Sequence, residues 1–122
     1  MLSDPLDFSP RHPRHEATGT ARLRVEVRQG GSPAAEPVDA QLVDLSRSGF
    51  QLHTPVPLSL GETIIARLSD EDSGLQLDLE GVARWQRPTD DGAAWFVGCE
   101  CEQELDWAIM GELFLNDVLV MD

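Results

Sequence analysis

The chain has 122 residues, of which 41% are hydrophobic, so it can form one domain around a single core. Its formal net charge of −13 repels the phosphate backbone of DNA and RNA and argues against binding to an extended nucleic acid. The segment from Met1 to Phe8 contains two aspartates instead of the basic start and apolar run of a secretory signal. No uninterrupted apolar stretch reaches the ~20 residues of a membrane helix. We therefore expect a soluble, cytoplasmic protein without a membrane span.

The first 19 residues contain three prolines among polar residues and show no hydrophobic period, which predicts a flexible arm. Residues 1–28 hold five arginines against four acidic residues, whereas residues 29–122 hold four arginines against 18 acidic residues. Every basic side chain is an arginine, whose planar guanidinium makes bidentate contacts that lysine cannot make. A small anion can therefore be captured where a few arginines converge, although the body of the chain is acidic.

From Thr20 onward, apolar and polar residues alternate with the period of two that is typical of half-buried strands. Six segments are predicted as strands in this way: residues 22–28, 38–42, 50–53, 63–68, 75–85 and 94–101. Turn-forming residues separate these segments, including a strong hairpin signal between Pro88 and Gly92. Because no helix is predicted between successive strands, the pattern indicates an antiparallel barrel or sandwich.

After Glu102 the spacing of apolar residues becomes helical, with Leu105, Ile109 and Leu113 on one side. Further apolar residues, among them Trp107, make this predicted helix hydrophobic over more than one stripe. We favour a terminal helix that packs on the barrel, and the alternative is that a second stripe meets a partner chain. The last residues, 118–121, can either end the helix or extend as an edge strand.

The only cysteines, Cys99 and Cys101, are spaced so that a strand places both side chains on the face to which Val97 points. We interpret them as thiols that face the core. A metal site needs about four ligands, and the chain offers only three histidines in addition, so we expect no metal. A reducing cytoplasm also argues against a disulfide. His53 is interpreted as a surface residue that faces solvent.

Two short motifs stand out against this background. Asp44, Ser46 and Gly49 form a D-x-S-x-x-G turn between two predicted strands. Arg11-His-Pro-Arg14 lies a few residues before the first predicted strand of the chain, residues 22–28. Each motif alone has a structural explanation, since Asp44 can bond a backbone N–H two residues on and terminal arginines are usually solvated. Arg47, inside the turn, can equally contact a phosphate or remain in solvent.

Together and in this order, the two motifs resemble the PilZ domain family. In that family, an R-x-x-x-R arm and a (D/N)-x-S-x-x-G turn clamp cyclic di-GMP against the outside of a six-stranded antiparallel β-barrel. The segments 83–85 and 95–98 are similar to the closing hairpin of these domains, and the resemblance covers roughly residues 10–102. It implies a mainly all-β fold, with a flexible arm over residues 1–19, a PilZ-like barrel over 20–102 and a C-terminal α-helix over 103–122.

The resemblance also implies a ligand site for cyclic di-GMP, made of Arg11, Arg14, Asp44, Ser46 and Gly49. These residue types suit the ligand chemically. A guanidinium can bond guanine O6 and N7 or bridge a base and a phosphate, and a carboxylate can accept from the guanine N1 and N2 hydrogens. Glycine, which lacks a Cβ, allows close approach by the ligand.

One position departs from the family pattern, because the partner arginine of Arg14 should stand at position 10, where this chain has Pro10. Arg11 is one residue late, and taking Arg11 as the first arginine makes His15 the second. The main hypothesis is a cyclic di-GMP receptor that changes conformation and signals to a protein partner. The alternative is a PilZ-like interaction module that binds no nucleotide. We expect no enzyme activity and no cofactor, and a homodimer remains open.

Overall fold

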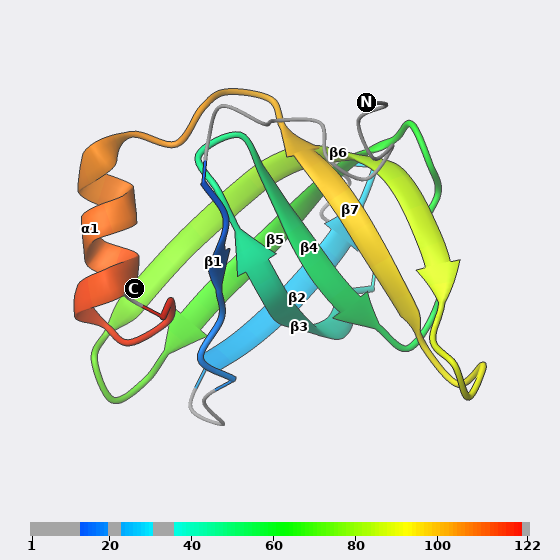
Figure 1. Cartoon of the computed structure of the whole chain (residues 1–122), viewed down its shortest axis with the longest axis horizontal. Coiled ribbons are helices and arrows are strands. Elements are labelled where there is room, and N and C mark those ends of the chain that lie inside the picture. The colour runs from blue at the N-terminus through cyan, green and yellow to red at the C-terminus, as the bar shows by residue number, and fades with distance from the viewer. Residues whose placement is uncertain (1–12, 20–22, 31–35, 121–122) are drawn as a thin grey trace.

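The computed structural model describes residues 13–19, 23–30 and 36–120. Within these residues the chain forms seven strands and one helix (Figure 1). Their bounds are β1 His15–Glu16, β2 Leu23–Gln29, β3 Val38–Leu45, β4 Gly49–Thr54, β5 Thr63–Asp70, β6 Leu75–Pro88, β7 Trp95–Cys101 and α1 Trp107–Leu115. No helix among the described residues is long and apolar enough to cross a membrane.

Six of the strands close into an antiparallel barrel in the order β3-β2-β5-β6-β7-β4. The barrel closes because β3 pairs with β2 through its first half, as at Val25↔Ala40, and with β4 along its second half, as at Leu42↔Leu52. A sandwich would have left these edges unpaired. The prediction of a six-stranded antiparallel barrel with a C-terminal helix is therefore confirmed.

The barrel interior is filled by the apolar residues of each alternating pattern. Val27, Leu52 and Val97 are fully buried, as is Cys99. Cys101 is only half-buried. Burial raises the pKa of both thiols to about 12, so they remain protonated at neutral pH. The predicted core role of the cysteines is confirmed for Cys99 and holds in part for Cys101.

Part of the segment predicted as a flexible arm, residues 1–19, forms a short strand in the structure. Strand β1 pairs with β3 at His15↔Leu45 and Glu16↔Asp44, and the Ala17 N–H donates to the Val43 carbonyl at 2.9 Å. It pairs with the part of β3 that lies beyond the end of β2. Two residues are too few to show an alternation of apolar and polar side chains, so the sequence pattern does not predict this strand. Its position is set by its pairing with β3.

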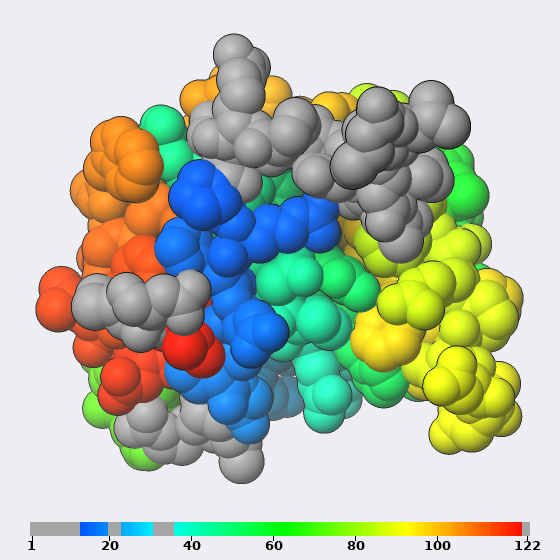
Figure 2. All heavy atoms as spheres, in the orientation of Figure 1, coloured from blue at the N-terminus to red at the C-terminus, as the bar shows by residue number. Residues whose placement is uncertain are grey.

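The C-terminal segment is an edge element and not a longer helix. The Asp106 carboxylate accepts from the Ile109 N–H at 2.8 Å and caps the start of α1, which ends at Leu115 with Asn116 as its C-cap. Asp117 then adopts a φ of 58°, which turns the chain back toward β1. Leu119 forms a bridge with Ala17, so the two terminal segments pair with each other. The space-filling view shows the blue residues around β1 lying between α1 and the green residues of β3 and β4 (Figure 2).

Candidate functional site

The D-x-S-x-x-G turn joins β3 to β4 and is closed by its own backbone. The Ser46 N–H donates to the Gly49 carbonyl at 2.8 Å. This is the N–H, two residues after Asp44, that the Asp44 side chain could have bonded, and its acceptor is a backbone carbonyl instead. The Ser46 hydroxyl accepts from the Ser48 N–H at 3.3 Å, and the Ser46 residue is only 3% exposed. Ser46 and Gly49 therefore shape the turn, and the carboxylate of Asp44 is left to act at the surface.

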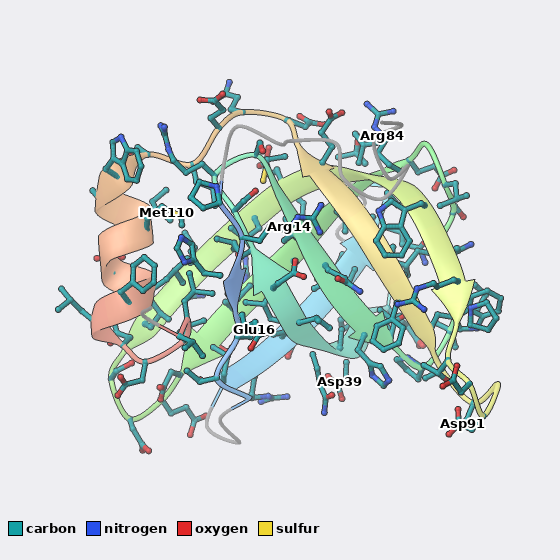
Figure 3. All side chains as sticks on the ribbon, in the orientation of Figure 1. Arg14, Glu16, Asp39, Arg84, Asp91 and Met110 are labelled. Carbon is teal, nitrogen blue, oxygen red and sulfur yellow. The ribbon has the colours of Figure 1, made fainter. Side chains whose placement is uncertain are left out.

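Asp44 lies beside Arg14 on the outside of the barrel. The Glu16↔Asp44 pairing brings β1 alongside, and Arg14 Nη1 lies 4.0 Å from Asp44 Oδ1. Figure 3 shows Arg14 projecting from the start of β1 toward the neighbouring strands. Burial raises the pKa of the Asp44 carboxyl above its ordinary value; Arg14 opposes the increase and Glu16 adds to it. The structure thus brings together one arm arginine and the acidic residue of the turn.

The two other arm positions behave differently from Arg14. Arg11 lies outside the described residues. His15 follows Arg14 on an extended segment, so its side chain points to the opposite side, where its ring meets Phe114 edge-on at 4.9 Å. Its Nδ1 is buried and has no hydrogen-bond partner among the described residues. His15 therefore packs against α1 and does not take the place of a second arm arginine beside Asp44.

A row of outward-facing positions continues from Asp44 across the sheet. Gln51 pairs with Asp44, Gly98 pairs with Gln51, and Trp85 pairs with Gly98. The indole of Trp85 lies directly over Gly98, because a Cβ built there would be 1.9 Å from Trp85 Nε1. Next to it, Phe96 contacts the His53 ring at 5.3 Å, so His53 is half-buried against an aromatic ring.

Trp85 was missed as a candidate site residue by the sequence analysis. Its place beside the turn depends on a register shift between Ala83 and Trp85 in the β6–β7 pairing. A strict alternation from Ala83, which is buried, would turn residue 85 inward. The one available signal was Gly98, since a glycine inside a strand often marks a close approach by another group.

Arg47 points to the helix side of the turn. Its Nε donates to the Leu105 carbonyl at 2.8 Å, and its guanidinium lies 4.3 Å from the centre of the Trp107 ring. Its Nη2 also lies 3.9 Å from a Glu104 carboxylate oxygen. In return, the Leu105 N–H donates to the Arg47 carbonyl at 2.7 Å. Arg47 is thus neither solvated nor directed at the Arg14–Asp44 pair, and it joins the turn to the start of α1.

The sequence matches the PilZ domain family over residues 10–113, which is most of its length. The chain belongs to the PilZ domain family. The match includes β1, the whole barrel and most of α1, so the resemblance seen in the two motifs is confirmed for the family and the fold.

Solved PilZ-type structures share this fold at low sequence identity. The Bacillus subtilis inhibitor of motility, MotI/DgrA, superposes with a TM-score of 0.59 at 14% identity, over 88% of this chain and 49% of that one. MrkH from K. pneumonia, in its complex with c-di-GMP, gives a TM-score of 0.59 at 18% identity, over 88% and 51%. The apo form of MrkH gives 0.57 at 19% identity, over 89% and 50%. This chain therefore spans about half the length of these proteins, and no curated protein sequence matches it.

Proposed function

We propose that this PilZ domain is a non-enzymatic cytoplasmic receptor for cyclic di-GMP that passes the signal to a protein partner. The observation that carries the proposal is the placement of Arg14 against Asp44 on the outer face, at the edge of the D-x-S-x-x-G turn. A titratable acid and a guanidinium side by side can bind the two edges of a guanine and the adjoining phosphate. MrkH, which shares the fold, was solved in a complex with c-di-GMP.

Arg14 and Asp44 have separate roles in this proposal. At 4.0 Å the contact between Arg14 Nη1 and Asp44 Oδ1 is longer than a charge-assisted hydrogen bond. In the proposed complex, the Arg14 guanidinium binds a ligand phosphate. Asp44, in its ionised form, accepts from the guanine N1 and N2 hydrogens. Arg11 supplies the second guanidinium in the proposed complex, in place of the family arginine that Pro10 replaces.

Trp85 extends this site with an aromatic surface. The Trp85 ring lies over Gly98, and Gln51 lies between Gly98 and Asp44 in the row of paired residues. Base–aromatic stacking contributes ~1–3 kcal/mol per base and accepts any base. In the proposed complex Trp85 holds a purine by stacking, while Asp44 and the arginines supply the contacts that distinguish guanine.

Arg47 gives the signal a route to the partner. A ligand contact at Asp44 acts on the same turn in which Arg47 holds Leu105 and Trp107 at the start of α1. The Ser48 carbonyl also accepts from the Cys101 N–H at 2.8 Å, just before that segment. A shift of the turn on binding therefore moves the start of α1, which is the conformational change we propose.

A calorimetric titration with cyclic di-GMP at near-physiological salt tests the receptor function. We expect saturable binding by the parent protein and a loss of about ten- to a hundredfold in affinity for Arg14→Ala, from one charge-assisted contact. Arg67→Ala is the matched control, because Arg67 pairs with Asp78 on β5 and β6 and should bind like the parent. Equal binding by Arg14→Ala and Arg67→Ala would refute the proposed arm role.

The second candidate function is an interaction module that binds no nucleotide. It is favoured by Pro10, which removes one arginine of the family arm, and by the exposed apolar residues of α1. No heat and no change in melting temperature with cyclic di-GMP would favour it. The fold would then serve only to present α1 to a partner.

A further inference from the structure

The outer side of α1 carries large apolar side chains that the barrel does not cover. Trp107, Gly111 and Leu115 are spaced four residues apart and so lie along one side of the helix. Trp107 is 70% exposed and Leu115 is 85% exposed. Met110 and Leu113, on the other side, are buried, and Figure 3 shows Met110 between α1 and the barrel. The helix is therefore held by one apolar side and displays a second one.

Gly111 leaves a gap in this outer side. A Cβ at Gly111 would have no neighbour within 4 Å, so no packing within the domain requires glycine here. Glycine inside a helix is less favourable than alanine because it loses more backbone freedom on folding. Between Trp107 and Leu115, Gly111 contributes no side chain, so the helix backbone there is not covered by one. We call Trp107, Gly111 and Leu115 the α1 outer face.

The charges around the α1 outer face are acidic. Glu104, Asp106, Glu112 and Asp117 are exposed in or beside α1, and residues 88–122 contain no arginine or lysine. Among the described arginines, Arg47 contacts Trp107 and Glu104. A second copy of this chain would bring two acidic rims together, which like-charge repulsion disfavours. A basic partner matches the rim.

We propose that the α1 outer face docks an amphipathic segment of a partner protein, whose apolar side chains pack on the helix at Gly111 between Trp107 and Leu115 and whose arginines or lysines meet the acidic rim. This proposal specifies the chemistry of the protein partner in the proposed function. Only the control of docking by nucleotide rests on that function. The α1 outer face and the Arg14–Asp44 pair use different residues, so docking and nucleotide binding can be tested separately.

The test is a fluorescence-anisotropy titration with a labelled synthetic helical peptide that carries leucines at i, i+3, i+4 and i+7 and arginines on both flanks. We expect Leu115→Ala and Gly111→Leu to weaken its binding at least tenfold. Leu60→Ala is the matched control, since Leu60 is 52% exposed in the β4–β5 connection, and it should leave binding unchanged. Amide NMR spectra of each variant verify that the barrel is intact.

Two peptide controls separate docking from simple charge attraction. A peptide of the same composition with the leucine stripe scrambled, and one with glutamate in place of arginine, should both bind at least tenfold more weakly. Equal binding of the scrambled peptide, or equal binding by all protein variants, would overturn the proposal. So would a concentration-dependent dimer, seen by sedimentation, that Leu115→Ala abolishes, because a second copy would then occupy the face.

Repeating the titration with saturating cyclic di-GMP distinguishes the two proposals. Docking that is specific but unchanged by a nucleotide that binds would support the α1 outer face and refute its control by the turn. Nucleotide binding without specific docking would refute the α1 outer face and leave the receptor function standing.

Discussion

The β3–β4 turn and helix α1 adjoin each other, yet they present different chemistry to solvent. On the turn side, Arg14 and Asp44 place both signs of charge on the same face as the Trp85 ring, with Gln51 between. On the α1 side, exposed apolar residues lie among exposed acidic residues, and Arg47 contacts Trp107. The net charge of −13 hides this difference. In our proposals, the turn side binds an anion and the α1 outer face binds a basic partner, with Arg47 between them.

The largest expected effect separates the two sides of α1. Leu113→Ala should lower the free energy of unfolding by ~2–5 kcal/mol, because Leu113 is fully buried and its loss leaves a cavity. Leu115→Ala should change it by less than ~0.5 kcal/mol, because that side chain lies in solvent. Urea unfolding measures both. Similar losses for the two variants would mean that the outer side of α1 packs within the domain.

The next effect tests the aromatic surface of the turn side. Gly98→Ala places a Cβ against the Trp85 indole and should displace the ring, weakening cyclic di-GMP binding by about tenfold, within the range of ~1–3 kcal/mol for lost base stacking. Gly111→Ala is the matched control, since its Cβ meets open space. Calorimetry should show parent-like nucleotide affinity for the control. Unchanged affinity in Gly98→Ala would exclude Trp85 from the site.

A smaller effect is expected where the two regions join. Arg47→Ala removes one hydrogen bond to Leu105 and the contact with Trp107, which together contribute about 1–2 kcal/mol. The start of α1 should then open more often, and hydrogen exchange at the amides of residues 105–110 should accelerate relative to that of β5. Any effect of cyclic di-GMP on peptide docking should also be lost. Parent-like exchange in this variant would remove Arg47 from the proposed route.

The smallest effect near neutral pH concerns Asp44. Burial raises the pKa of this carboxyl in the folded protein, so it takes up a proton at a higher pH than it does in the unfolded chain. The contribution of Asp44 to stability should therefore rise as pH falls through its folded pKa. Cyclic di-GMP affinity should fall over the same range, because the protonated carboxyl loses an acceptor.

Asp44→Asn provides the comparison for this pH dependence. The amide keeps one acceptor oxygen and does not titrate, so binding should be weaker at neutral pH and nearly independent of pH down to the acidic range. Calorimetry at several pH values measures both proteins. The same decline in affinity for parent and variant would show that another group is responsible.

Some of the candidate site was within reach of the sequence because it is local. Asp44, Ser46 and Gly49 belong to one turn, and Arg14 lies just before the strands that the alternation predicts. Other members depend on which segments become neighbours. The contact of Arg47 with Leu105 spans 58 positions in the chain, and no spacing within the turn indicates it. From the sequence, a phosphate contact and a solvated side chain were equally plausible for Arg47, and the position of α1 decided against both.

The sequence alone determined the features that a hydrophobic period and short motifs can encode. These are the six strands, their inward faces, the C-terminal helix and the PilZ family. The tertiary structure decided the rest. It placed β1 on the free edge of β3, paired the C-terminal residues with Ala17, and shifted the register so that Trp85 covers Gly98. These features depend on hydrogen-bond pairing between segments that are distant in the chain. The two-residue alternation predicts which residues face inward. It does not predict which strand edge remains free or where a bulge reverses the alternation.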